Sequence, residues 1–246
     1  MIDILDEQKT RLISRSTKCA LCNHESDQQF LLSASSAGSP DLDTRPAGPA
    51  RSATINAIQQ CPVCGYCALE IDAAPDVAAT VVAGDEYQAA VTVPTLFVSN
   101  TKWHRLSVLL ATRWHGLSLI QEAGGDMSAS GWSAMSTAWV YDDAKLAPLA
   151  KTARLRAVSL FRRAWEQSQR FSDDAQMEHA ILADLARRTD EFGPALAYCD
   201  EAEREIGSET ALRMAALQRE FAMRRDTRCH NAGETIGKSN VRRRHA

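Results

Sequence analysis

The chain has 246 residues, of which 45% are apolar and 24% are charged, and its formal net charge is −3. This composition is that of a globular protein, and the small negative charge gives the chain as a whole no attraction to nucleic acid or to an anionic membrane. Met1–Lys9 has no apolar core, and the apolar stretches elsewhere are interrupted well before about 18 positions. We therefore expect neither a signal peptide nor a transmembrane helix, and we expect a cytoplasmic protein.

The first 71 residues differ in composition from the rest of the chain. They contain five of the seven cysteines and a run of small and turn-forming residues from Ser33 to Pro40. Short strands are predicted at 12–16, 29–33 and 55–60. Because the segment has too few apolar residues for a core of its own, we expect a small module that is stabilised by a metal ion.

Four of the cysteines form two Cys-x-x-Cys pairs that are separated by 38 residues. Such a pair supplies two thiolates from one tight turn, and Zn²⁺ takes four ligands in a tetrahedron. Asn23 and Gly65 follow the pairs at the position where this turn requires left-handed backbone, which Asn and Gly tolerate. The pattern predicts one structural Zn²⁺ ion; a rubredoxin-like iron centre and a thioredoxin-type redox couple are the alternatives. The predicted ligands are Cys19, Cys22, Cys61 and Cys64.

Other side chains in this segment carry more than one interpretation. Cys67 is either an auxiliary thiol for ligand exchange or redox chemistry, or a small apolar side chain beside the second turn. His24 is either an alternative ligand or a residue on the surface near the metal. Asp41, Asp43 and Arg45, in the loop 39–46, either contact a ligand or form a local polar network that stabilises a turn.

Good helix formers dominate from residue 72 onwards. Short links between the predicted helices imply antiparallel helical hairpins. We therefore expect a metal-binding module at 1–71, a helical domain at 72–230 and a flexible basic tail at 231–246. The helices are predicted at 76–91, 96–123, 127–143, 147–171, 174–189, 192–206 and 209–228.

A weak internal repeat appears within the helical part. The spacing from Asp126 to Gly131 recurs from Asp190 to Ala195, 64 residues later, which is near twice the tetratricopeptide period of about 34. The fold class that we predict is mainly α, with a small N-terminal zinc-ribbon-like β module followed by tetratricopeptide-like hairpins. An ordinary helical bundle is the alternative.

Several segments together resemble a known family. Beside the Cys-x-x-Cys pairs, these are Ser-Pro-Asp-Leu-Asp-Thr-Arg-Pro at 39–46, Cys-Pro-Val-Cys-Gly-Tyr at 61–66 and Trp-Val-Tyr-Asp-Asp-Ala at 139–144. The chain resembles, over about 15–230, a bacterial family in which a zinc-knuckle domain precedes tetratricopeptide-like helices and for which no activity is established. The departure is Asn23, where such knuckles usually have Gly. Membership would imply the fold and the metal, and nothing about a substrate.

The expected function is that of a non-enzymatic adaptor, in which the zinc is structural and the helical hairpins bind a protein partner. The sequence contains no phosphate-binding, dinucleotide-binding, metalloprotease or serine-hydrolase motif. One alternative is a regulator that binds nucleic acid through the zinc ribbon, although residues 1–70 carry 6 Lys and Arg against 8 Asp and Glu. The other is a thiol- or metal-responsive sensor that uses Cys67.

Overall fold

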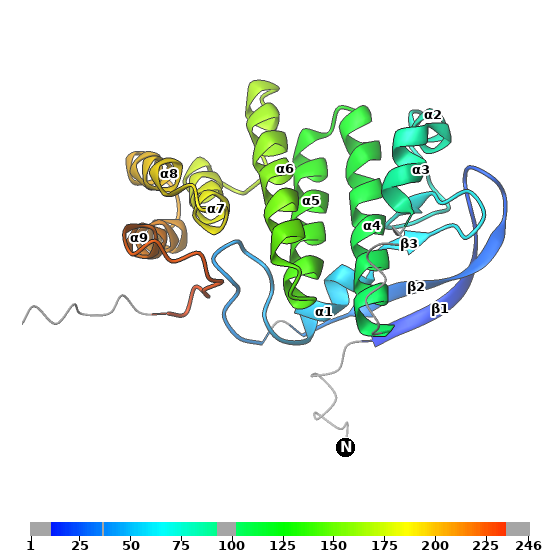
Figure 1. Cartoon of the computed structure of the whole chain (residues 1–246), viewed down its shortest axis with the longest axis horizontal. Coiled ribbons are helices and arrows are strands. Elements are labelled where there is room, and N and C mark those ends of the chain that lie inside the picture. The colour runs from blue at the N-terminus through cyan, green and yellow to red at the C-terminus, as the bar shows by residue number, and fades with distance from the viewer. Residues whose placement is uncertain (1–10, 36, 93–101, 235–246) are drawn as a thin grey trace, which may run out of the picture. The chain divides into compact units, whose positions relative to one another are not determined.

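The structure is a computed structural model that describes residues 11–35, 37–92 and 102–234. The described chain is mainly helical, with small antiparallel sheets near the N-terminus and helical hairpins beyond them (Figure 1). It divides into two compact units. Unit 1 comprises Met1–Gly38 and Pro46–Asp173, and unit 2 comprises Ser39–Arg45 and Asp174–Ala246.

Two antiparallel β-hairpins form the N-terminal part of unit 1. The first pairs β1 (Arg11–Lys18) with β2 (Glu25–Ser33), and the second pairs the two-residue strands β3 (Gln59–Gln60) and β4 (Cys67–Ala68). The strands predicted at 12–16 and 29–33 lie within β1 and β2. Helix α1 (Gly48–Asn56) was not predicted, and its last residues replace the start of the strand expected at 55–60. Pro49 suits the first turn of this helix, since its missing N–H has no helical partner there.

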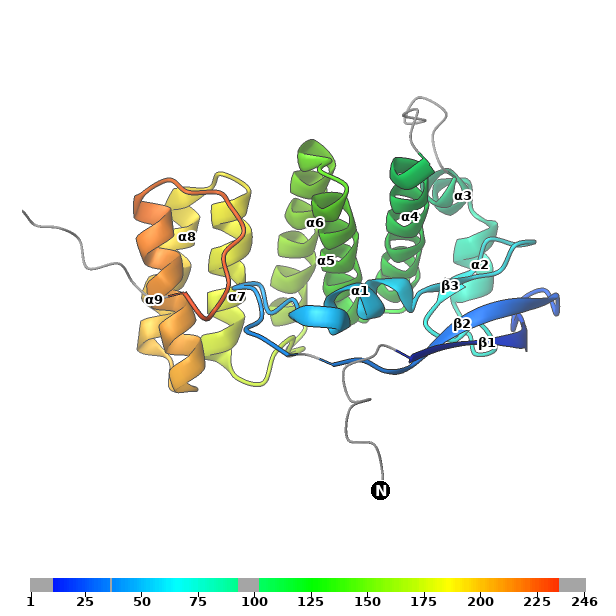
Figure 2. The ribbon, with the colours of Figure 1, turned by 90° about the horizontal axis from the view of Figure 1, so that it is seen from below.

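The helices of unit 1 correspond to the predicted segments, although residues 96–101 of the second segment lie outside the described residues and the segment predicted at 147–171 ends as a helix at Glu166. The segment predicted as one helix at 76–91 is two helices, α2 (Ala78–Ala83) and α3 (Asp85–Val91), separated by Gly84. They precede α4 (Lys102–Ala123), α5 (Met127–Asp143) and α6 (Ala147–Glu166). Helix α5 packs against both α4 and α6, so the three stand side by side in chain order. Figure 2 shows α1 and the β1–β2 hairpin along one side of this row.

The same turn ends α4, α5 and α7 (Ala175–Arg188). A left-handed residue follows each helix, namely Gly125, Lys145 and Asp190, with φ between 60° and 82°. The next N–H donates to the carbonyl five residues earlier, as Asp126 does to Gln121, and this is a Schellman ending. Since Gly125 and Asp190 are the equivalent positions, these turns align at an offset of 65 residues, one more than the sequence repeat indicated.

Unit 2 is a three-helix arrangement in which α7, α8 (Phe192–Arg204) and α9 (Glu209–Met223) all contact one another. A buried polar network joins α7 to α9: Arg187 donates to Gln218 Oε1 at 2.6 Å and to Asp184 Oδ1 at 2.8 Å. This fully buried guanidinium also donates to the carbonyls of Asp226 and Arg228. The carboxylate of Asp184 compensates its charge in the core.

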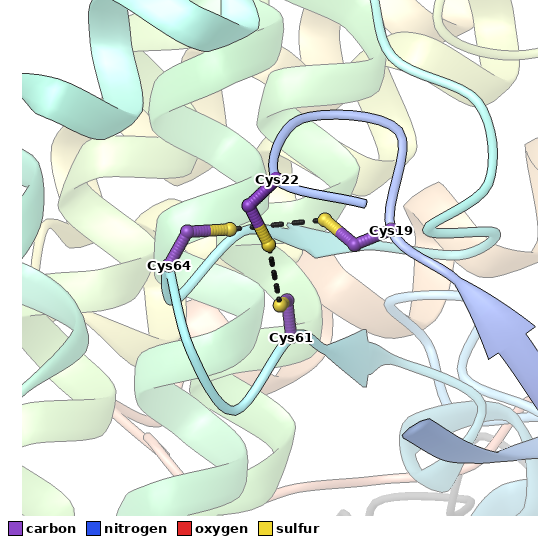
Figure 3. A group of neighbouring side chains, drawn as sticks. All are labelled: Cys19, Cys22, Cys61 and Cys64. Carbon is purple, nitrogen blue, oxygen red and sulfur yellow. Dashed lines mark hydrogen bonds between the residues drawn. The ribbon is translucent and has the colours of Figure 1, made fainter. Parts of the chain in front are cut away.

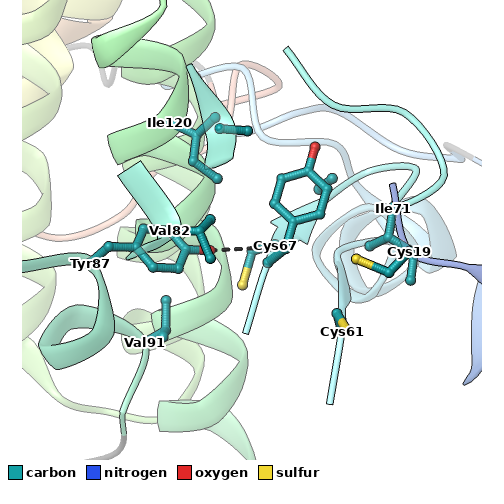
Figure 4. Packing of buried hydrophobic residues seen from close by; sticks show 11 residues of the cluster. Cys19, Cys61, Cys67, Ile71, Val82, Tyr87, Val91 and Ile120 are labelled. Atoms are coloured by element: carbon teal, nitrogen blue, oxygen red, sulfur yellow. Dashed lines mark hydrogen bonds between the residues drawn. The ribbon is translucent and has the colours of Figure 1, made fainter. Parts of the chain in front are cut away.

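The expected domain boundaries differ from this division. The metal-binding segment shares one hydrophobic core with α2, α3 and α4, in which Tyr66 and Ile71 pack with Val82 and Ile120 (Figure 4), so residue 71 does not end a unit. The helices predicted as one domain at 72–230 are split between the units at residue 173. Of the expected tail, residues 231–234 belong to unit 2, and the rest lies outside the described residues.

Within the described part of the chain, no helix combines the length and the apolar character that crossing a bilayer requires.

Candidate metal centre

The first Cys-x-x-Cys pair lies in the turn of the β1–β2 hairpin. The N–H of Cys19 donates to the carbonyl of His24 at 2.9 Å, and the N–H of Asn23 donates to the carbonyl of Cys19 at 2.9 Å. Asn23 has φ of 60°, as the sequence predicted for the position after the second cysteine. This tight turn makes both thiols of the pair point to the same side.

The second pair repeats this geometry in the β3–β4 hairpin. The N–H of Cys61 donates to the carbonyl of Tyr66 at 2.9 Å, and the N–H of Gly65 donates to the carbonyl of Cys61 at 3.0 Å. Gly65 has φ of 76°, so the left-handed residue again follows the second cysteine. The two turns are therefore matched zinc-knuckle-like hairpins; we call them knuckle 1 (residues 19–24) and knuckle 2 (residues 61–66).

The two knuckles bring four sulfur atoms together (Figure 3). Cys19 Sγ lies 3.7 Å from Cys64 Sγ, and Cys22 Sγ lies 3.5 Å from Cys61 Sγ. All four sulfurs lie within 4.8 Å of one another, a group that can hold a metal ion. Four thiolates at about 2.3 Å from a tetrahedral ion are separated by about 3.8 Å, so the number, type and spacing of these side chains fit such an ion.

The surroundings of the sulfurs combine burial with hydrogen-bond donors. Burial raises the pKa of Cys19, and it also raises that of Cys64. Burial acts in the same direction on Cys61, but the backbone N–H groups of Cys64 and Val63 outweigh it and lower the pKa of this thiol to about 7. Knuckle 2 therefore favours a thiolate at one ligand position, because its own backbone stabilises the negative charge.

A network of buried groups anchors knuckle 2 to the helices. The Tyr87 hydroxyl on α3 donates to the carbonyl of Gly65 at 3.0 Å and accepts from the N–H of Cys67 at 3.0 Å (Figure 4). Gly116 on α4 leaves room for this ring, since a Cβ there would lie 3.1 Å from the hydroxyl and 2.7 Å from Val91. Knuckle 2 is thus hydrogen-bonded to α3 and shares its hydrophobic core with the helices.

Cys67 is not one of the four grouped sulfurs. Its side chain is fully buried in the core shared with α2–α4, and its thiol donates to the carbonyl of Gly65 at 3.2 Å. Burial raises the pKa of Cys67 to about 11, so at neutral pH it is a thiol and a weak nucleophile. This placement agrees with the interpretation of Cys67 as a small apolar side chain beside the turn.

His24 does not join the sulfur group either. The residue is exposed, and its contribution to knuckle 1 is the backbone carbonyl that accepts from Cys19.

The loop that contains Asp41, Asp43 and Arg45 belongs to unit 2, whereas the four cysteines belong to unit 1. All three polar residues are buried there. Asp43 pairs with Arg188 of α7 at 3.2 Å, and the N–H of Arg45 donates to Asp43 Oδ1 at 3.2 Å. The loop is therefore held in a polar network of the fold, the second of the two interpretations given above, but the network is not local because its partner comes from α7.

One apolar side chain and two backbone interactions also hold this loop against the rest of unit 2. Leu42 is fully buried against Met214, Leu217 and Phe221 of α9, and its N–H donates to the carbonyl of His230 at 2.9 Å. Asp41 forms an isolated antiparallel bridge with Asn231. Ser39–Arg45 is thus an extra layer of the three-helix unit.

The anchoring residues Tyr87 and Gly116 were missed from the sequence. A tyrosine and a glycine in helical segments carry no spacing that relates them to a metal-binding turn, and only the packing of α3 on α4 brings them to knuckle 2.

The chain matches no family model, and comparison with curated proteins and with solved structures finds no similar protein. The resemblance to the bacterial zinc-knuckle family therefore stays a prediction.

Proposed function

We propose that the chain carries one structural Zn²⁺ ion, held by Cys19, Cys22, Cys61 and Cys64. The observation that supports it is the group of four sulfurs, all within 4.8 Å of one another, on two matched knuckles. Four thiolates complete the coordination shell of Zn²⁺ and leave no position for water or substrate. The proposed role of the ion is to stabilise the fold, since each knuckle is only a short hairpin and the ion crosslinks them.

Metal analysis tests this proposal directly. We expect one equivalent of zinc per chain, with four sulfur neighbours at about 2.3 Å in X-ray absorption spectra. Cys22→Ser should lower the zinc content, whereas the matched variant Cys199→Ser, at a buried cysteine of unit 2, should retain it. Iron in place of zinc, or full zinc retention in Cys22→Ser, would contradict the assignment.

At the level of the cell, we propose a cytoplasmic, non-enzymatic adaptor of the zinc-knuckle family that the sequence resembles. None of the seven cysteines forms a disulfide, which suits a reducing compartment. A closed metal shell and a row of helical hairpins are the features of an interaction protein. In unit 2, the segment Ser39–Arg45 of the same chain already packs against the helices. We therefore assign partner binding to the helices α4–α6 of unit 1, where Leu155 of α6 is 46% exposed.

Affinity capture with the zinc-loaded protein tests the adaptor role. Leu155→Glu should release a bound protein while zinc content stays at one equivalent, and Leu212→Glu, at a leucine of α9 in unit 2 that is 45% exposed, serves as the control. Equal capture by both variants would reject this surface.

The two alternatives are less well supported. The buried, weakly acidic thiol of Cys67 does not suit a sensor. The exposed basic residues Arg15 and Lys18 of β1 lie beside acidic residues of β2, and Lys18 pairs in register with Glu25. This mixture of charges on the hairpin does not favour nucleic acid.

A further inference from the structure

A trough lies in unit 1 beside knuckle 2. It consists of two adjoining cavities of about 320 and 420 Å³ that share Asn56, Leu110 and Arg113. The first extends between α1, α4 and α5, and the second extends past Gln60 and Pro62 to β2. Cavities of this size accommodate small organic ligands.

Arg113 of α4 is half-buried where the two cavities meet, and its guanidinium forms no ion pair with the residues that the structure describes. Its Nε donates to Gln60 Oε1 at 3.1 Å, a neutral acceptor. Within the described residues no carboxylate lies within salt-bridge distance of this guanidinium. Partial burial lowers the pKa of Arg113, because removing a cation from water disfavours its charged form.

Two buried arginines of other helices show which interaction the half-buried Arg113 lacks. Arg154 pairs with Asp142 and Arg187 pairs with Asp184, so each buried guanidinium has a carboxylate. Arg113 instead lines open space on both sides of its side chain. An anion in the trough would supply the ion-pair partner that Arg113 lacks, and the two oxygens of a planar carboxylate match the two N–H groups that a guanidinium presents side by side.

The walls of the first cavity define the rest of the ligand. Ile55, Leu109, Leu110 and Val140 give it a mainly apolar surface, with Ser107 as a small polar group. Asp143 also lines this cavity, but it already has a partner within the protein. Asp27, an exposed carboxylate, lines only the second cavity. In the first cavity, the apolar walls and the guanidinium of Arg113 favour a molecule with one carboxylate and a short apolar body.

We propose that this trough is a binding site for such carboxylates, with Arg113 as the residue that binds the carboxylate and the α1–α4–α5 walls as the site of the apolar body. The same chemistry occurs in a free short-chain acid and in the C-terminal residue of a peptide. The trough adjoins knuckle 2 at Pro62 but none of the four cysteines lines it, so the proposal requires neither the metal ion nor the adaptor role proposed above.

Isothermal titration calorimetry of the zinc-loaded full-length chain tests the proposal. The probes are hexanoate and its neutral counterpart 1-hexanol, and N-acetyl-Ala-Leu with a free carboxylate and the same dipeptide as its amide. We expect at least one carboxylate to bind with a stoichiometry of one, and its neutral counterpart to bind about tenfold or more weakly. The tighter of the two carboxylates identifies the source.

Variants place the binding at Arg113. Arg113→Gln should weaken carboxylate binding about tenfold or more, with zinc content and circular dichroism unchanged. Lys151→Gln, which removes one charge from an exposed position of α6, should bind as the parent does. No binding of either carboxylate, equal binding of acid and neutral counterpart, or unchanged affinity in a folded Arg113→Gln protein would each overturn the proposal. Should Arg113→Gln not fold, the comparison of charged and neutral probes on the parent decides.

Discussion

Replacing Leu42 by Ala tests whether Ser39–Arg45 is part of the core of unit 2. Leu42 is fully buried among α7 and α9 side chains, including Ala180, Ala215 and Phe221. The substitution removes the three carbon atoms beyond Cβ, which corresponds to about 2.4 kcal/mol of lost transfer free energy at about 0.8 kcal/mol per carbon. The cavity that remains adds about 1 kcal/mol, because helix packing relaxes only in part. We therefore expect Leu42→Ala to lower the free energy of unfolding of unit 2 by about 3–4 kcal/mol.

Urea unfolding followed by circular dichroism measures this loss, and it should be fitted with two transitions because the chain has two compact units. Hydrogen exchange in α7 and α9 reports the same change locally. Leu212→Ala is the matched control, since this leucine of α9 is 45% exposed and its truncation should cost less than about 1 kcal/mol. Zinc content should be unaffected, because the cysteine group belongs to unit 1. Equal losses for Leu42→Ala and Leu212→Ala would refute the assignment of the loop to the core.

Three further predictions concern unit 1. Tyr87→Phe removes the hydroxyl that holds knuckle 2, so it should destabilise unit 1 by about 1–3 kcal/mol and speed the release of zinc to a chelator. Gly65→Ala places a Cβ at φ of 76° and should cost about 1–2 kcal/mol, measured by urea unfolding. Burial and, to a smaller extent, the charge of Arg156 lower the pKa of His115 to about 4, against the opposing effect of Glu122. His115 therefore takes up a proton near pH 6.5 in the unfolded chain but only near pH 4 in the folded chain. The free energy of unfolding should fall as the pH drops from 6.5 to 4, by about 2 kcal/mol at pH 5. His115→Gln should remove this part of the pH dependence.

Each of these has a result that would contradict it. Unchanged zinc release in Tyr87→Phe, relative to Tyr141→Phe as a control for hydroxyl loss, would show that the hydroxyl does not support the knuckle. The control for Gly65→Ala is Gly193→Ala, where a new Cβ meets nothing within 4 Å, and equal effects would argue against backbone strain. For His115, identical stability losses in parent and His115→Gln between pH 7 and pH 5 would exclude the imidazole as the cause.

The knuckles were predictable because the interactions that form them are local. Each is closed by hydrogen bonds among six consecutive residues, and each needs one left-handed residue, which Asn23 and Gly65 supply. The spacing of the cysteines and the residue after each pair therefore carry most of the required information. Helices α4–α6 were predictable for a similar reason. Helix α5 begins and ends at the predicted residues: Gly125 makes the turn before it, Asp126 caps its N-terminus, and Lys145 takes the left-handed conformation after its end.

The partners of the loop 39–45 could not be read from the sequence. Proline, aspartate and arginine in a Ser- and Gly-rich segment are typical of an exposed turn. Asp43, however, pairs with a residue 145 positions away, and Leu42 packs on α9. Neither contact leaves a periodic trace in the segment itself, so only tertiary packing shows that these polar residues are buried.

The sequence by itself determined which four cysteines can share an ion, how the backbone turns at each pair, and where most helices lie, because hydrogen bonds between near neighbours decide these features. The tertiary structure decided what the metal module packs against and which unit the loop belongs to. It also decided where an arginine lacks a carboxylate, since Arg113 looks like any other helical arginine until its neighbours are placed. These properties depend on burial and on charge pairing between distant segments, and such interactions are fixed only when the whole chain has folded.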